Sequence, residues 1–177
     1  MIKGKVICAV RNNDDLEIAL KSSAESVFML STNLETVACQ IEKTHQAGKK
    51  LFVHIDLADG IGKDEFGIKY LKSIGADGII STRTNIIKTA KKLGVFTIQR
   101  FFIVDSRSID TTVESASASK ADVIELMPGT IGKVIKKIKG LIDTPIVAGG
   151  IIETVEEIEE AILNGAVAVS TGKKDLW

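Results

Sequence analysis

Cysteine is scarce in this sequence of 177 residues, and the two that occur stand far apart. Cys8 and Cys39 form no CxxC pair and have no spacing typical of metal ligands. Isolated thiols of this kind are typical of buried, reduced cysteines in a protein that stays in the cytoplasm. The sequence therefore predicts a cytoplasmic protein without disulfides and without a metal site.

Long apolar runs and an imbalance of charge are also missing. No segment approaches the roughly 20 apolar residues that a membrane-spanning helix needs, and the apolar run at 6–10 is too short for a signal peptide. Lys and Arg number 23, as do Asp and Glu, so the formal net charge is +0. A neutral chain has no overall attraction to membranes or nucleic acid, so such contacts would require local segregation of charge.

Aromatic residues make up only 5% of the chain, although 45% of it is hydrophobic. The core must therefore be aliphatic, as it is in barrels and buried parallel sheets. A chain of this length can bury one core and is too short for two ordinary domains. We expect residues 1–177 to form a single domain.

Short apolar runs alternate along the chain with amphipathic helical segments. The expected strands are 6–10, 27–30, 51–55, 78–80, 96–98, 123–126, 145–148 and 167–169. The expected helices are 14–21, 34–47, 66–74, 85–93, 109–118, 131–139 and 154–164. Such alternation indicates a parallel sheet. Eight strands and seven helices predict an α/β protein, a minimal (β/α)8 TIM-type barrel that lacks its last helix.

The alternative is a doubly wound open sheet, which would carry a glycine-rich phosphate motif after its first strand. The first expected strand is followed by Arg11-Asn12-Asn13-Asp14-Asp15, which contains no glycine. This favours the barrel.

Small residues end the last two expected strands. The seventh ends in Gly149-Gly150 and the eighth in Ser170-Thr171-Gly172. Loops at these two positions of a barrel often bind phosphate, because glycine allows close backbone approach and amides at a helix start favour an anion. We therefore expect the segment 145–172 to build an anion site.

Polar residues at other strand ends should surround the same mouth of the barrel. Alternation along the third strand puts His54 and Asp56 on one face, while Arg100 and Glu125 end the fifth and sixth strands. Glu125 and Asp56 would be costly to bury unpaired, so a structural pair with Arg100 or His54 is an alternative to ligand contact. The loop 59–64 is a candidate lid. No strand ends in the lysine that a Schiff-base aldolase needs, whereas an isomerase with Glu125 or Asp56 as its base remains possible.

Six segments in order along the chain resemble the glycerol-3-phosphate-responsive antiterminators of bacterial glycerol uptake operons. They are FVHIDLADGIGKDEFGIKYL (52–71), DGIISTRTNIIKTAKKLG (77–94), TIQRFFIVDS (97–106), DVIELMPGTI (122–131), PIVAGGII (145–152) and AVSTGKKDLW (168–177). The resemblance implies a barrel that binds glycerol 3-phosphate as effector and acts on the leader of an mRNA to prevent premature termination. It implies neither catalytic activity nor a cofactor. The runner-up function is an enzyme for a small phosphorylated three-carbon substrate.

Two further expectations concern partners. Local basic charge on two helices could contact RNA phosphates, with no aromatic platform for bases; the residues are Lys88, Lys91, Lys92, Lys136 and Lys137. Without a helix outside the eighth strand, an apolar stripe beside the first and seventh helices would be uncovered. Such a patch usually marks an interface, so we expect a homodimer with Leu176 and Trp177 in the gap or at the interface.

Overall fold

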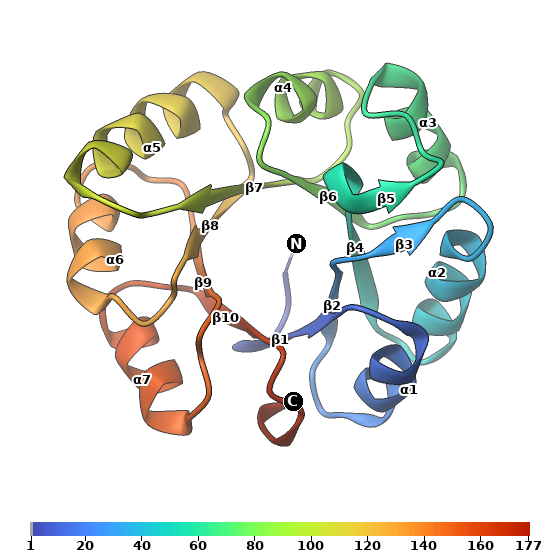
Figure 1. Cartoon of the computed structure of the whole chain (residues 1–177), viewed down its shortest axis with the longest axis horizontal. Helices are drawn as coiled ribbons and strands as arrows, with labels where there is room; N and C mark the ends of the chain where they lie inside the picture. The colour runs from blue at the N-terminus through green and yellow to red at the C-terminus, as the bar shows by residue number, and fades with distance from the viewer. Residues whose placement is uncertain (1) are drawn as a thin grey trace.

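A computed structural model describes residues 2–177 and contains a closed barrel of eight parallel strands (Figure 1). Around the barrel the order is β1-β10-β9-β8-β7-β6-β4-β2, and β2 returns to β1. The strands are β1 (Val6–Val10), β2 (Ser26–Met29), β4 (Lys50–His54), β6 (Gly78–Ser81), β7 (Thr97–Phe102), β8 (Val123–Met127), β9 (Ile146–Gly149) and β10 (Ala168–Thr171). The predicted TIM-type barrel is confirmed, and each expected strand overlaps one of these eight.

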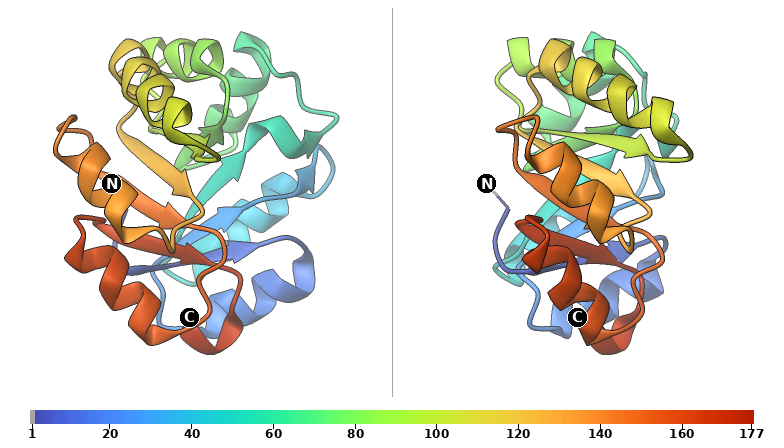
Figure 2. Two further views of the ribbon diagram at one scale, coloured as in Figure 1. Left: turned by 60° about the vertical axis from the view of Figure 1, so that its left-hand side comes forward. Right: turned by 90° about the vertical axis from the view of Figure 1, so that its left-hand side faces the viewer.

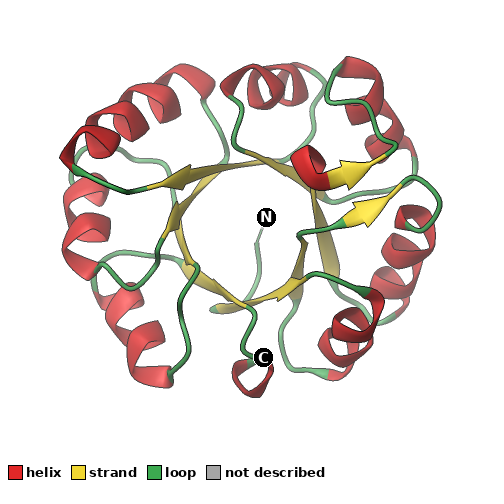
Figure 3. Cartoon of the chain, in the orientation of Figure 1, coloured by secondary structure: helices red, strands yellow, loops and turns green. Residues whose placement is uncertain are grey.

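Helices form an outer ring around the strands (Figure 3). They are α1 (Asn13–Lys21), α2 (Val37–Gln46), α3 (Glu65–Ser73), α4 (Thr84–Lys92), α5 (Ser106–Ser119), α6 (Gly132–Lys139) and α7 (Val155–Leu163). Outside β10 lies only the short 3-10 helix η2 (Lys174–Leu176), between α7 and α1 (Figure 1). The expected absence of an eighth helix within the described residues is thus confirmed.

Capping explains where the helix bounds differ from the expected ones. The α5 helix begins at Ser106, three residues early, because the Asp105 side chain accepts a hydrogen bond from the backbone N–H of Ser108 in a capping box. The α2 helix begins at Val37, later than expected, because the Asn33 side chain accepts the N–H groups of Glu35 and Thr36 in a turn before it.

A second, two-stranded parallel sheet was not anticipated from the sequence. It pairs β3 (Thr32–Asn33) with β5 (Ala58–Asp59), which follow β2 and β4. The loop 59–64 is therefore anchored, and Gly62 and Gly67 touch so closely that a Cβ on Gly67 would lie 1.8 Å from the carbonyl oxygen of Gly62. The hypothesis that this loop is a mobile lid is not supported by these contacts.

The barrel interior is layered. The lower layer, on the side away from the carboxyl ends of the strands, is apolar. It includes Phe28, Phe52, Ile80 and Val147, with Ile2 packed against it. The chain before β1 lies inside the ring of strands in the face-on view (Figure 1), and the side view places it opposite the carboxyl ends of the strands (Figure 2). Between strands and helices two larger aliphatic clusters complete the core. The lower layer closes one end of the barrel, so any ligand must enter at the other.

No helix in residues 2–177 has the length and apolar character needed to cross a membrane.

Candidate functional site

A buried polar layer lies above the apolar one, and its centre is Glu125 on β8. This side chain is 0% exposed. One carboxylate oxygen accepts a hydrogen bond from Arg100 Nε at 2.6 Å, and the other accepts one from Ser170 Oγ at 2.6 Å. Gly149 is required here, because a Cβ at that position would lie 2.5 Å from both Glu125 Oε1 and Ser170 Oγ. The pairing of Glu125 with Arg100, which the sequence left open, is therefore present.

Two side-chain nitrogens in this layer have no hydrogen-bond partner among residues 2–177. They are Nη2 of Arg100, which is 6% exposed, and Nδ1 of His54, which is 3% exposed. Burial and the neighbouring Arg100 guanidinium lower the pKa of His54 to about 4, so its imidazole is neutral near pH 7. Buried polar atoms rarely stay unpaired, so both nitrogens are candidates to contact a ligand.

Asp56 was expected to share one strand face with His54, but the strand does not extend to Asp56. The strand ends at His54, and residues 55–57 form a 3-10 helix (η1, Ile55–Leu57), which breaks the alternation. The Asp56 carboxylate accepts hydrogen bonds from Ser81 Oγ at 2.8 Å and from Thr82 N and Oγ1 at 2.8 and 3.0 Å. Burial alone would raise the pKa of Asp56, but these bonds lower it overall. Asp56 thus fixes the loop after β6.

The loops after β9 and β10 face each other across the mouth. Backbone N–H groups of Ile151 and Gly172 have no acceptor among the described residues, whereas that of Gly150 faces the carbonyl of Ser170 in the strand ladder. Gly150 has φ +77° and Ile151 has φ +59°, a conformation uncommon for a β-branched side chain. Strain of this kind concentrates at ligand sites. The expected glycines are therefore brought together with unpaired amides beside them.

Other polar groups in these loops are already occupied. Thr171 Oγ1 donates to the carbonyl of Ile152 at 2.7 Å. At the start of α7 the Glu157 carboxylate accepts the N–H groups of Glu153 and Thr154 at 2.7 and 3.1 Å. The capping box therefore occupies the N–H groups of Glu153, Thr154 and Glu157 at this helix start.

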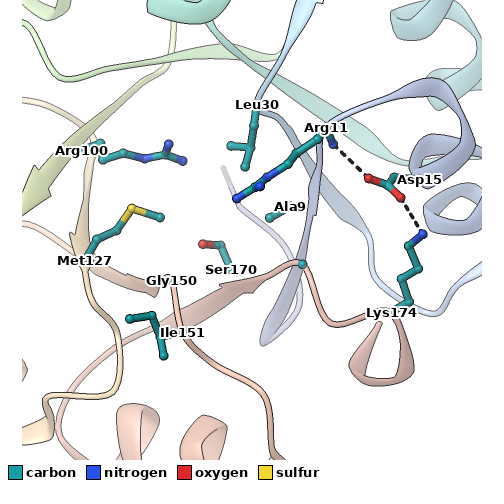
Figure 4. Close-up of a pocket in the computed structure, with 11 residues that line it drawn as sticks. Ala9, Arg11, Asp15, Leu30, Arg100, Met127, Gly150, Ile151, Ser170 and Lys174 are labelled. Atoms are coloured by element: carbon teal, nitrogen blue, oxygen red, sulfur yellow. Dashed lines mark hydrogen bonds and ion pairs between the residues drawn. The ribbon is translucent and has the colours of Figure 1, made fainter.

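A cavity of about 310 Å³ opens above the polar layer (Figure 4). Arg11 from the end of β1 and Arg100 from β7 point into it from opposite sides, and Met127 and Leu30 also line it. An adjoining cavity of about 250 Å³ lies between the loops after β9 and β10. Their shared lining is Gly150, Ile151 and Gly172, which includes the two residues with free amides.

Sequence reasoning missed Arg11, Asp15 and Lys174, which all line the larger cavity. The signal for Arg11 was available, because it is the first residue after an expected barrel strand. The stretch was used only to reject a glycine motif. Lys174 was not assigned to the mouth, because its contact with Asp15 joins the two ends of the sequence.

The five lysines expected to contact RNA lie on two helices that α5 separates (Figure 1). Lys91 is not free, because its Nζ lies 2.6 Å from Asp122 Oδ1. Lys88, Lys92, Lys136 and Lys137 are exposed. Lys92, Lys136 and Lys137 lie in last helical turns, which face the closed end of the barrel because the helices run against the strands. One continuous basic surface including Lys91 is therefore not formed.

Within the described residues, no group of three or more His, Cys, Asp or Glu side chains is arranged to hold a metal ion.

Comparison with known proteins matches the family model described as glycerol-3-phosphate responsive antiterminator over residues 6–177. The chain is 38% identical over 173 residues to the protein YgcP of Escherichia coli (strain K12), covering 97% of this chain and 91% of that one. Among solved structures, it is similar to the glycerol uptake operon antiterminator regulatory protein of Listeria monocytogenes str. 4b F2365. The TM-score is 0.94 and the identity 36%, over 99% and 95% of the two chains.

A glycerol uptake operon antiterminator-related protein of Thermotoga maritima MSB8 has a TM-score of 0.88 and 32% identity, over 100% and 99% of the two chains. The family match spans the strands, the polar layer and both loops of the mouth. The chain therefore belongs to the family of glycerol-3-phosphate responsive antiterminators.

Proposed function

We propose that this protein senses glycerol 3-phosphate and, when it is bound, acts on an mRNA leader to promote antitermination in glycerol-uptake genes. The observation that carries the ligand part is the mouth, where Arg11 and the free amides of Ile151 and Gly172 line the same cavity. Backbone amides and an arginine fork are the donors that phosphate prefers. Family membership supports the regulatory part.

The polar layer suits the other end of the ligand. With the phosphate between the β9 and β10 loops, the glycerol hydroxyls would meet the unpaired nitrogens of Arg100 and His54. A neutral imidazole nitrogen can exchange a hydrogen bond with a hydroxyl, and the guanidinium donates one. Asp56 is not part of this ligand contact, because Ser81 and Thr82 already surround its carboxylate.

The enzyme alternative is less well supported by the same geometry. A general base needs a carboxylate oxygen within reach of a substrate proton. Both oxygens of Glu125 accept hydrogen bonds from protein groups, and both oxygens of Asp56 do as well. The candidate bases thus hold the barrel together, which favours binding without turnover.

Calorimetry with glycerol 3-phosphate, glycerol and inorganic phosphate tests the ligand, and product analysis after long incubation tests for turnover. We expect glycerol 3-phosphate to bind more tightly than either of its parts and to be recovered unchanged. Failure of all three to bind, or conversion of the phosphate ester, would refute the sensor.

For RNA we propose the exposed lysines of two helices, Lys88 and Lys92 on α4 with Lys136 and Lys137 on α6. Lys91 is excluded because its ion pair with Asp122 engages it. The Lys88→Glu/Lys92→Glu variant should weaken leader binding and flatten its dependence on salt, while leaving ligand affinity unchanged. Lys21→Glu on α1, which replaces an exposed lysine on another helix, is the control. Equal RNA affinity of the variant and the wild type would exclude this surface.

Ligand and RNA affinities must be coupled equally in both directions, typically by about fivefold to 150-fold. Glycerol 3-phosphate should tighten leader binding by the same factor by which the leader tightens glycerol 3-phosphate. Titrating each partner with and without the other measures both factors, and indifference to the ligand would contradict antitermination by sensing.

A further inference from the structure

The segment after β10 returns to the mouth and is fastened there at two points. Trp177 packs against the aliphatic cluster of the first strands and helices, and its Nε1 donates to the carbonyl of Thr171 at 2.8 Å. Lys173 N donates to Thr171 Oγ1 at 3.0 Å. Both bonds converge on the last residue of β10, next to Gly172 in the phosphate loop. Leu176 and Trp177 are half-buried in the gap outside β10, where an eighth helix would lie in a complete barrel.

Lys174 belongs to this segment and lines the cavity. Its Nζ forms an ion pair with Asp15 Oδ1 at 2.6 Å, and the other Asp15 oxygen accepts the backbone N–H of Arg11 at 3.4 Å (Figure 4). The hydrogen bond from Lys174 is the main reason that the pKa of Asp15 lies below its usual value. Asp15 thus connects the segment after β10 to the loop after β1.

The charges around the larger cavity are nearly balanced before any ligand binds. Arg100 is paired with Glu125, and Lys174 is paired with Asp15. Asp15 is the one acidic side chain in the lining of this cavity, among three cationic ones. A phosphate between the loops would meet Asp15 as a like charge and Lys174 as an opposite one. The ion pair of Asp15 and Lys174 therefore opposes an incoming anion as long as it stays closed.

We propose that Lys174 is a ligand-binding residue. Without ligand it pairs with Asp15, and on ligand binding it transfers its hydrogen bond from Asp15 to the phosphate of the ligand. This inference rests on the proposed function, since it concerns the same anion site. Movement of Lys174 then shifts η2, and Trp177 with it, so the segment after β10 responds directly to occupancy of the mouth.

A single and a double variant, Asp15→Asn and Asp15→Asn/Lys174→Gln, separate this role from a merely structural ion pair. Inorganic phosphate and glycerol 3-phosphate are the probes. Asp15→Asn removes the competing carboxylate, so the ligand should bind about threefold to tenfold more tightly. Adding Lys174→Gln to Asp15→Asn should then weaken binding by about tenfold or more, because a charge-assisted hydrogen bond to phosphate is lost.

A lysine that only pairs with Asp15 would behave differently. Its removal would matter when Asp15 is present and would have no effect in the Asp15→Asn protein. The matched control is Glu17 on α1 with Lys43 on α2, also an ion pair between two elements, at 2.7 Å. Glu17→Gln and Glu17→Gln/Lys43→Gln should leave ligand affinity unchanged.

Trp177 gives a second readout, because it is the only tryptophan in the sequence. Phosphate or glycerol 3-phosphate should change its fluorescence in the wild type and not in Lys174→Gln, measured at saturating ligand. Equal affinities of Asp15→Asn and Asp15→Asn/Lys174→Gln, or unchanged fluorescence in a wild type that binds ligand by calorimetry, would overturn the inference and leave the sensor intact. A wild type that binds neither probe would instead refute the proposed function.

Discussion

Replacement of Gly149 by alanine tests whether the polar layer is as tightly packed as its distances indicate. The new methyl carbon would lie 2.5 Å from Glu125 Oε1 and 2.5 Å from Ser170 Oγ. Neither atom can withdraw easily, because Arg100 holds the carboxylate at 2.6 Å and Ser170 is paired with Gly149 in the strand ladder. The hydrogen bond between Glu125 and Ser170 must therefore break or the strands must shift.

The cost can be worked out from the two effects together. A buried oxygen that loses its partner costs about 1–3 kcal/mol, and overpacking of a dense core costs about 1–3 kcal/mol more. We expect the free energy of unfolding to fall by about 2–6 kcal/mol. A chain of this size should then melt roughly 4–24 °C lower.

Urea denaturation of the Gly149→Ala variant measures the loss, with Gly140→Ala as the control. Gly140 has right-handed helical backbone angles, and a Cβ there would meet only ordinary contacts at 3.5 and 3.6 Å. The control should lie within about 0.5 kcal/mol of the wild type. If Gly149→Ala did so too, the packing argument for the polar layer would be refuted.

Three further predictions concern pH, the phosphate loop and assembly. The pKa of His54 is about 4 in the folded chain against 6.5 ordinarily, so the unfolded state binds a proton first as pH falls. Its contribution to stability is complete above about pH 6.5 and decreases by up to about 3 kcal/mol by pH 4; urea titrations of wild type and His54→Gln should diverge in that range, and parallel curves would contradict it. Gly150→Val should abolish phosphate binding in calorimetry but keep the fold by circular dichroism, and unchanged binding would place the anion elsewhere. A homodimer should form through the helices that flank η2, where Ile18 and Val155 are exposed; light scattering should show Val155→Glu as a monomer, and a strictly monomeric wild type would exclude the dimer.

The barrel could be predicted because its signal is local and repeated. Apolar runs such as 123–126 and glycines such as Gly165 recur at the spacing that a parallel sheet with outer helices requires. The expectation of a phosphate site in the loops after β9 and β10 came from their position on the last two strands. Both inferences need only the order of elements along the chain.

The remainder depends on where side chains meet in space. The misplacement of Asp56 arose because alternation was extended past His54, where the backbone turns into a 3-10 helix. Lys91 was predicted to contact RNA because the sequence does not reveal its ion pair with Asp122, which lies 31 residues away along the chain. Lys174 belongs to the mouth only through Asp15, a contact between the two ends of the sequence. Such pairings carry no periodic signal.

The apolar layer at the base of the barrel has a consequence for how information crosses the molecule. Phe28, Phe52, Ile80 and Val147 fill the interior beneath the polar layer, and Ile2 covers them from below. Close-packed side chains of this kind leave no axial path for water, ions or a moving group. A signal from the mouth to the lysines near the closed end must therefore run through the wall. It would be carried by small sliding motions of individual helices against their strands, and helices on opposite sides of the barrel could respond independently.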